Sequence, residues 1–568
     1  MALTINRRLS RSVLFVILTM ALGCSGGRRG LPSGPLSFTE HIAPIVFENC
    51  ASCHRPGGSA PFSLLSYRDV ASHATRIVEV TEARYMPPWL PERGDAEFVG
   101  ERGLDDGEIA TIRRWVDAGA LEGDPAHLPP LPENVSGWAL GPPDLVVKAP
   151  AYTVPAGAPE RYRNLVVPLT LSEARYVATV DLRPGHPSVV HHARIMVDTT
   201  ASSRQFDAED AEPGYDGMHL ISKADNPGGH FLGWTPGKVT TRGADSLAWR
   251  LDPGADMVLQ LHLRPREETV TVEPEIAFYF AERPPTRTPT LIMLGAKIID
   301  IPAGATDYTV TDDFTLPVPI QVLSVYPHAH YLGKEMEIYA MLPNGRKQGL
   351  LHIKDWDFNW QDDYRYAQPI ALPAGATLTM HYTFDNSSAN PQNPNVPPRR
   401  VVYGSKSSDE MAELLLQVVP QNAADLARLR RDVAWKDETR DIAYLAHAAF
   451  TQGKASAAAG RPDEAIRHFQ QALQYHSNDV DILTAMTEAF LAKGDFDAAI
   501  LVGERAAGLS QRQNAATLGT LAESYASAGQ TERAIATVRE AIAVASRAGD
   551  RTRSGELRAR LATYRERR

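Results

Sequence analysis

Three patterns of hydrophobic and polar positions follow one another along the chain. Residues 37–125 carry apolar side chains at helical spacing, as in FTEHIAPIVFENC, and predict a small helical unit. From about 143 to 420, short β-rich runs such as DMVLQLHLR alternate with Pro, Gly and Asn turns, which is typical of all-β sandwiches. From about 440, Ala-rich helical segments replace the strands. The pattern predicts a multidomain chain with all-α ends and an all-β centre.

The domain boundaries follow from these changes in pattern. The β-rich part is long enough for two domains, and we expect jelly-roll-like sandwiches at 143–288 and 289–420. A Pro-rich stretch at 126–142 reads as a linker, and a second linker is expected at 421–439.

The C-terminal segments AAAGRPDEAIRHFQQAL, LAKGDFDAAILVGERAA and YASAGQTERAIATVREAI are self-similar. Their glycines fall at 460, 494 and 529, a period of 34 and then 35 residues. Alanines recur five and twelve positions after each glycine, at 465, 499 and 534 and at 472, 506 and 541. Residues 440–568 therefore resemble tetratricopeptide repeats, which are paired helices stacked into a solenoid. Such arrays are generally interaction surfaces, so a protein partner is expected.

The N-terminus reads as a secretion signal. Arg7, Arg8 and Arg11 precede the apolar run VLFVILTMALGC. This run is shorter than a typical transmembrane helix and has the length of a signal-peptide hydrophobic region. The run ends at Cys24 and looks like a bacterial lipoprotein signal, although Ala21 stands where the usual motif prefers Leu. This predicts a signal peptide at 1–23, lipidation of Cys24 and a flexible tether at 24–36. The alternative is ordinary secretion, and both place the mature protein outside the cytoplasm, in the periplasm of a Gram-negative-type bacterium.

Composition adds one exclusion. The chain has 568 residues, of which 43% are hydrophobic and 22% charged, as in ordinary globular proteins. The formal net charge of −10 gives no indication of a nucleic-acid partner.

Two of the three cysteines form the sequence NCASCH, which reads as a c-type haem attachment. Cys50 and Cys53 would form the thioethers of one haem c, and His54 would be the proximal iron ligand. Met86, in RYMPPW, follows a helix and is the candidate distal ligand, as in many small cytochromes c. Residues 37–125 are therefore interpreted as a cytochrome c-like domain. The alternative is a zinc pair completed by His41 and His73.

Candidate metal ligands are scattered through the β-rich part. His328 and His330 in VYPHAHYLGKEM are two positions apart on a predicted strand, so both side chains point to one face. The adjacent His191 and His192 in VVHHARIMV would share a metal only where the backbone bulges or turns. His262 lies near the end of another predicted strand, and Met411 starts a further one.

Together these motifs resemble the type II copper monooxygenase family, which includes peptidylglycine alpha-hydroxylating monooxygenase and dopamine beta-hydroxylase. VVHHARIMV and LQLHL match the strands that hold one copper, which implies His191, His192 and His262 as ligands of the electron-transfer copper. HAHYLGK and SSDEM match the segments that hold the other, which implies His328, His330 and Met411 at the oxygen-binding copper. The resemblance covers roughly residues 143–420 and implies two β-sandwiches with a solvent-filled cleft between the coppers. It also implies hydroxylation of a C–H bond by O2.

The sequence departs from the peptide-amidating branch of that family at the substrate site. Tyr326 stands where that branch has an Arg that grips the substrate carboxylate, and Glu413 and Leu415 replace its Asn and Tyr. A C-terminal glycine substrate is therefore not expected. Gln260 shares a strand face with His262 and is a candidate hydrogen-bond partner or a solvent-facing residue. Four further histidines of the β-rich part, His186, His230, His352 and His381, are interpreted as hydrogen-bonded or surface residues.

The sequence favours an extracytoplasmic copper-dependent monooxygenase that acts on a small organic substrate with O2 and receives electrons from the attached haem c. The alternative is a non-enzymatic lipoprotein that relays electrons through haem and copper to a partner held by the repeats. A copper-storage or sensing scaffold is a third interpretation.

Overall fold

The structure is a computed structural model that describes residues 34–566, except 57, 59, 95, 133–136, 219–221, 232 and 239. The expected signal peptide at 1–23, Cys24 and most of the tether lie outside the described residues. No helix in the described part of the chain has the length and apolar composition that crossing a bilayer requires. The chain divides into two compact units, of which the first comprises residues up to 55, 62–87 and 103–132.

The first unit is helical. Its elements are η1 (Phe38–Ile42), α1 (Ala43–Asn49), α2 (Tyr67–Ser72), α3 (Ala74–Glu82), α4 (Asp106–Asp117) and η2 (Pro125–His127). A reciprocal capping box starts α4, because the Asp105 side chain accepts from the Glu108 amide while the Glu108 side chain accepts from Asp105. Phe38, Ile42 and Trp115 are buried in the shared core of these helices.

Residues 88–102 belong to the second unit, so the expected helical unit at 37–125 is interrupted. Trp89 lies edge-to-face on Tyr364 with ring centroids 5.4 Å apart, and Phe98 stacks on Tyr366 at 5.2 Å. The Val99 amide also donates to the Arg365 carbonyl at 2.8 Å. Burial of these aromatic rings holds the segment 88–102 against the β core. No local helical or strand pattern in the sequence predicted this packing.

The first β region contains eleven strands among its described residues. They are β1 (Leu145–Lys148), β2 (Tyr152–Val154), β3 (Arg161–Pro168), β4 (Arg175–Arg183), β5 (Val190–Asp198), β6 (Tyr215–Asp216), β7 (Gly233–Trp234), β8 (Trp249–Leu251), β9 (Asp256–Leu263), β10 (Val270–Val272) and β11 (Glu275–Phe280). Between them lie α5 (Ser202–Glu209), η3 (Pro227–Gly229) and η4 (Asp245–Leu247). The sheets β1-β11-β4-β8 and β6-β3-β9-β5-β7 contribute to one hydrophobic core, and β10-β2 forms a separate pair. Strand β9 is buried along its whole length, including the polar side chains of Asp256, Gln260 and His262.

The second β region is built in the same way. Its elements are β12 (Thr290–Ala296), β13 (Asp300–Ile301), β14 (Tyr308–Thr315), β15 (Ile320–Ala329), β16 (Gly333–Met341), β17 (Lys347–Ile353), η5 (Phe358–Trp360), β18 (Tyr364–Leu372), β19 (Thr377–Phe384), β20 (Val401–Val402) and β21 (Ala412–Pro420). The antiparallel sheets β12-β21-β15-β18 and β14-β19-β16-β17 share one core, and β13-β20 is a separate pair. The pairing of β12 with β21 brings the two ends of this region's sequence together, and β15 pairs with the other edge of β21.

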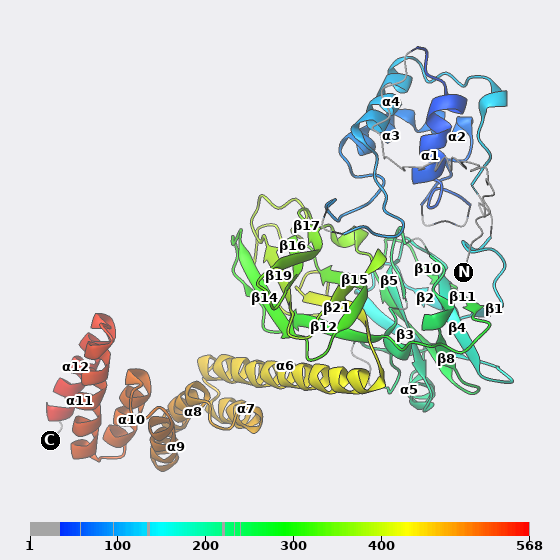
Figure 1. Ribbon diagram of the computed structural model, residues 1–568. Helices are drawn as coiled ribbons and strands as arrows, with labels where there is room; N and C mark the ends of the chain where they lie inside the picture. The colour runs from blue at the N-terminus through cyan, green and yellow to red at the C-terminus, as the bar shows by residue number, and fades with distance from the viewer. Residues whose placement is uncertain are drawn as a thin grey trace, which may run out of the picture. The chain divides into compact units, whose positions relative to one another are not determined.

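Helix α6 (Ala423–Ala458) is one unbroken helix, drawn in yellow in Figure 1. The linker expected at 421–439 is its first half, because Asn422 caps the helix by accepting from the Asp425 amide. Leu429 is 0% exposed in the core of the second β region, and Lys436 forms an ion pair with Asp312 of β14 at 2.7 Å. This half of α6 is therefore part of the β region rather than a spacer.

The C-terminal helices follow as α7 (Pro462–Tyr475), α8 (Val480–Lys493), α9 (Phe496–Leu509), α10 (Ala515–Ser527), α11 (Thr531–Arg547) and α12 (Arg551–Glu566). The repeat alanines Ala465, Ala472, Ala499, Ala506, Ala534 and Ala541 are all fully buried. Gly460, Gly494 and Gly529 have positive φ at the ends of helices, where an L side chain would be strained. The spacing of small residues thus corresponds to close packing between consecutive helices.

Replacing Leu429 by Ala is expected to destabilise the second β region by about 2 to 5 kcal/mol, because it removes a fully buried side chain from a closed core. Faster hydrogen exchange in β12 and β21, measured by mass spectrometry on the full chain, would report this. Trp435→Ala is the matched control on the same helix, since Trp435 is 72% exposed and should leave exchange unchanged. Wild-type exchange in Leu429→Ala would contradict the integration of α6.

Candidate metal centres

A cluster of three histidines lies on neighbouring strands of the first β region. In the pairing of β5 with β9, His192 is directly opposite His262. The register shifts between Val190 and His192, so His191 occupies the bulge that adjacent metal-binding histidines require. One ring nitrogen from each of His191, His192 and His262 lies within 4.8 Å of the others.

The ring nitrogens of this cluster leave lone pairs for a metal ion. His262 Nδ1 lies 3.1 Å from His192 Nε2, while His262 Nε2 contacts a carboxylate oxygen of Glu160. Both ring nitrogens of His191 are buried without a hydrogen-bond partner in the described structure. Because buried polar atoms are nearly always paired, these atoms fit a missing ligand. Three imidazoles suit zinc, copper, iron or nickel.

Burial keeps these imidazoles neutral. It lowers the pKa of His191 to about 2, with additional unfavourable charge interactions from His262 and Arg264. Burial also lowers the pKa values of His192 and His262, although Glu160 opposes the shift at His262. Neutral imidazole is the form that binds metal ions.

A second cluster lies where β15 pairs with β21. His328 is opposite Glu413, and Ala329, directly before His330, is opposite Ala412, directly after Met411. The rings of His328 and His330 are 5.2 Å apart, and His330 and Met411 are almost completely buried. The backbone amides of His330 and Met411 both donate to Glu410, so the two segments are adjacent at this end of the sheet.

Hydrogen bonds orient both rings of the second cluster. His330 Nδ1 donates to the Asp409 carbonyl at 3.1 Å, and His330 Nε2 is buried without a partner among the described atoms. His328 Nδ1 lies 2.8 Å from Gln361 Oε1. Both contacts leave Nε2 as the nitrogen that can bind a metal. Burial lowers the pKa of His330 to about 3 and also lowers that of His328.

The buried side chain of Glu410 joins the two segments that carry the second cluster. Its carboxyl group accepts from the backbone amides of His330, Leu332 and Met411, at 2.5, 3.0 and 2.8 Å. Burial raises the pKa of Glu410 to about 8, although these three hydrogen bonds act in the opposite direction. Glu410 therefore ties the end of β15 to the start of β21.

Each cluster contributes at least one side chain to the wall of one cavity of about 330 Å³. His192 and Gln260 line it from the first β region, and His328 and Met411 line it from the second. The fully buried ring of Phe358 packs against both clusters, with its centroid 4.2 Å from that of His191 and 5.0 Å from that of His330. Both clusters therefore share one cavity wall and one buried phenyl neighbour.

The three residues named as candidates for the substrate pocket all line this cavity. Gln260 donates to Asn164 and to the carbonyls of Gly217 and Met218, so its amide holds a loop rather than a histidine. The Tyr326 hydroxyl donates to Gln361 Oε1, and its ring lies parallel to His328 at 6.3 Å. Glu413 is half-buried beside His328.

Sequence reasoning missed Glu160, Gln361, Phe358 and Glu410. Gln361 is 33 residues from His328, and Glu160 is 102 residues from His262. No local pattern connects positions so far apart. Of the four, Glu410 was the easiest to identify from the sequence, because it directly precedes Met411 in SSDEM.

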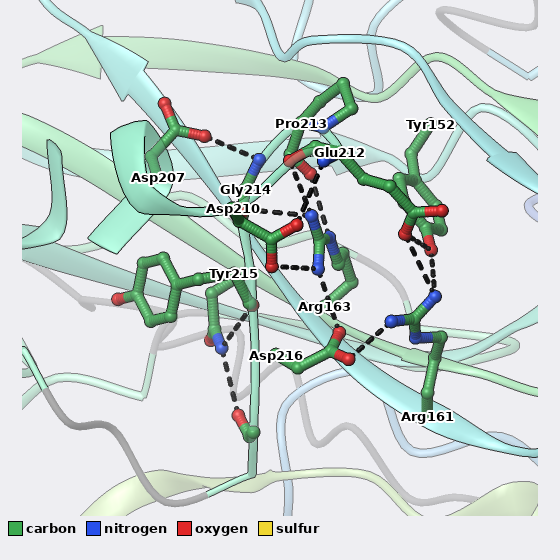
Figure 2. A network of polar contacts seen from close by, with 12 residues as sticks. Tyr152, Arg161, Arg163, Asp207, Asp210, Glu212, Pro213, Gly214, Tyr215 and Asp216 are labelled. Carbon is green, nitrogen blue, oxygen red and sulfur yellow. Dashed lines mark hydrogen bonds and ion pairs between the residues drawn. The ribbon is translucent and has the colours of Figure 1, made fainter. Parts of the chain in front are cut away.

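The loop held by Gln260 is also fixed by a buried arginine (Figure 2). The guanidinium of Arg163 is 0% exposed and donates to the carboxylates of Asp210 and Asp216 and to the carbonyls of Glu212, Pro213 and Gly214. The network holds the segment that leads to Met218 in the cavity wall.

Replacing Arg163 by Ala is expected to cost about 3 to 5 kcal/mol of stability in the first β region, because it leaves two carboxylates and three carbonyls without their buried partner. Urea unfolding followed by tryptophan fluorescence measures it. Arg161→Ala is the control from the same network; Arg161 is 29% exposed, and its loss should cost roughly 1 kcal/mol or less. Equal losses in the two variants would contradict the role of Arg163.

The first unit contains the proposed haem residues. Cys50 and Cys53 are both partly accessible, and burial raises the pKa of Cys50 to about 12. His54 Nδ1 donates to the Phe62 carbonyl at 3.1 Å, which leaves Nε2 for an axial bond to iron. Met86 is half-buried, and its amide donates to the Val80 carbonyl. No described contact joins His54 directly to Met86. These donors fit a haem c.

The family comparison matches part of the C-terminal helices. Residues 456–507 match the family described as tetratricopeptide repeat. The comparison with curated proteins found no match.

Three similar solved structures are the Sgt2 TPR domain from Aspergillus fumigatus, PcrH in complex with the chaperone binding region of PopD, and the TPR2B-domain:pHsp70 complex of yeast Sti1. Their sequences are 17%, 17% and 14% identical. They cover 22%, 21% and 22% of this chain and 78%, 91% and 98% of their own. The TM-scores are 0.20, 0.20 and 0.21.

Proposed function

We propose that the protein is an extracytoplasmic copper-dependent monooxygenase. The observation that carries the proposal is that two separate histidine-containing clusters contribute side chains to the wall of one cavity. The reaction would convert R–H, O2, two electrons and two protons into R–OH and water. A small organic substrate suits a cavity of about 330 Å³.

The residue types favour copper at both clusters. His191, His192 and His262 would hold one ion, and His328, His330 and Met411 the other. Imidazole and thioether ligands suit a metal that cycles between Cu(I) and Cu(II). Bound copper would supply one-electron redox chemistry and activation of dioxygen. The chain itself orients the ligand nitrogens through Glu160, Gln361 and the Asp409 carbonyl and encloses the site.

The remaining parts support this chemistry. A haem c held by Cys50, Cys53, His54 and Met86 would supply the two electrons one at a time. A lipid on Cys24 would anchor the chain to a membrane and keep it in the periplasm. The tetratricopeptide repeats would bind a protein partner, as such domains commonly do.

The metal content is the direct test. The full chain, stripped of metal and titrated with Cu(II), is expected to bind two coppers and to show the absorption of one haem c. The dithionite-reduced haem should reoxidise when Cu(II) is bound, as followed by stopped-flow absorbance. A haem that stays reduced on the turnover timescale would contradict its role as donor, and absence of copper binding would overturn the proposal.

Product analysis separates the enzyme from an electron relay. Screening of small organic compounds under ¹⁸O2 should give one product that contains a single labelled oxygen atom, measured by mass spectrometry. Two bound coppers, rapid electron passage to a partner and no labelled product would instead favour a non-enzymatic relay.

A further inference from the structure

The side chain of Glu160 links the segments that carry the two histidine-containing clusters. No sequence motif indicates this position. Glu160 directly precedes β3, and its side chain is 23% exposed. One carboxylate oxygen contacts both His262 Nε2 and Ser407 Oγ, and the other accepts from the Ser407 amide at 3.2 Å. His262 belongs to the first β region and Ser407 to the second. One carboxylate thus connects a histidine of the first cluster to the segment that leads to Met411.

The contact with Glu160 determines which nitrogen of His262 can bind a metal. A carboxylate can only accept, so the imidazole proton is held on Nε2. The lone pair then lies on Nδ1, which faces His192 Nε2 at 3.1 Å. Tyr162 stacks on the His262 ring with centroids 4.2 Å apart and planes 7° apart, which fixes the ring plane. Tautomer and orientation of His262 are therefore both set by neighbouring side chains.

Ser407 extends this connection toward the second cluster. It is 6% exposed, and it lies two residues before Asp409, whose carbonyl accepts from His330 Nδ1. Glu410 and Met411 follow directly. A displacement of Glu160 would therefore change the positions of proposed ligand residues in both β regions.

We propose that Glu160 is a positioning residue of the three-histidine site, where it holds the Nε2–H tautomer of His262 and couples this site through Ser407 to the segment carrying Met411. The inference rests on the proposed function, because it assumes that the three histidines bind copper. It goes beyond that function by assigning a role to a residue outside the ligand set.

The test uses the full chain with His330→Ala, so that Cu(II) reports only the three-histidine site. In this background, Glu160→Ala is expected to lower Cu(II) affinity about 10- to 100-fold and to change the copper hyperfine splitting in the EPR spectrum. Glu160→Gln keeps an oxygen that accepts from Nε2–H and should recover most of the affinity. Glu335→Ala removes the carboxylate that pairs with His352 at 2.7 Å, away from the clusters, and is the matched control with unchanged copper binding.

The outcomes separate this inference from the proposed function. Absence of Cu(II) binding in the His330→Ala background itself would overturn the three-histidine copper site. Binding there, with wild-type affinity and spectrum in Glu160→Ala, would overturn the role of Glu160 alone. Equal losses in Glu160→Ala and Glu160→Gln would overturn the acceptor role. Because Glu160→Gln retains size and shape, a general folding defect of Glu160→Ala does not decide the result.

Ser407→Ala tests the coupling between the two regions. It removes the hydroxyl donor to Glu160 and is expected to increase hydrogen exchange at 403–411 and to alter the EPR spectrum of the three-histidine copper. An unchanged spectrum would show that Glu160 acts on His262 without Ser407 and would overturn the coupling.

Discussion

Replacing His330 by Ala is expected to remove one of the two proposed coppers and to lower product formation by more than about 100-fold. This loss exceeds the one typical of a residue that only hydrogen-bonds to a metal ligand. Within the described part of the chain His330 Nε2 is buried without a partner, and Nδ1 donates to the Asp409 carbonyl, so Nε2 is the nitrogen left for a metal. Copper content by mass spectrometry of the metal-loaded protein, together with the yield of ¹⁸O-labelled product, measures both effects.

His352→Ala is the matched control for this prediction. His352 lies in the same β region, pairs with Glu335 and has a side chain that is 24% exposed. It should keep two coppers and full product formation. Two bound coppers in His330→Ala, with an unchanged EPR spectrum, would show that the second cluster is not a copper site.

Glu410→Ala is expected to destabilise the second β region by about 3 to 5 kcal/mol and to abolish copper binding at the second cluster. The variant leaves the buried amides of His330, Leu332 and Met411 without an acceptor. Two of these amides belong to proposed ligands, so stability and metal binding should be lost together. Urea unfolding and copper stoichiometry on the same preparation measure the two losses.

Two variants make this result specific. Glu410→Gln keeps one oxygen acceptor and should lose less stability than Glu410→Ala. Glu413→Ala removes a half-buried carboxylate three residues along the chain and should leave stability near wild type. A Glu410→Ala protein that retains both wild-type stability and the second copper would contradict the proposed role of Glu410.

Local patterns carried much of the information about the elements. Side chains alternate between the two faces of a strand, so His328 and His330 were expected on one face. Their ring centroids lie 5.2 Å apart. The alanines spaced from each repeat glycine are fully buried, and residues 456–507 match the tetratricopeptide repeat family. These features depend on residues within one or two elements, so periodicity was sufficient to predict them.

Features that depend on distant residues came only from the tertiary structure. The bulge at His191 exists because β5 pairs with β9, and Glu160 meets His262 across 102 residues. The segment 88–102 joins the β core through aromatic burial, and α6 replaces an expected linker because Leu429 fills that core. Sequence alone therefore determined the candidate ligands and the repeat pattern. Only packing decided how the ligands are oriented, because hydrogen-bond partners and buried neighbours are chosen by the whole fold.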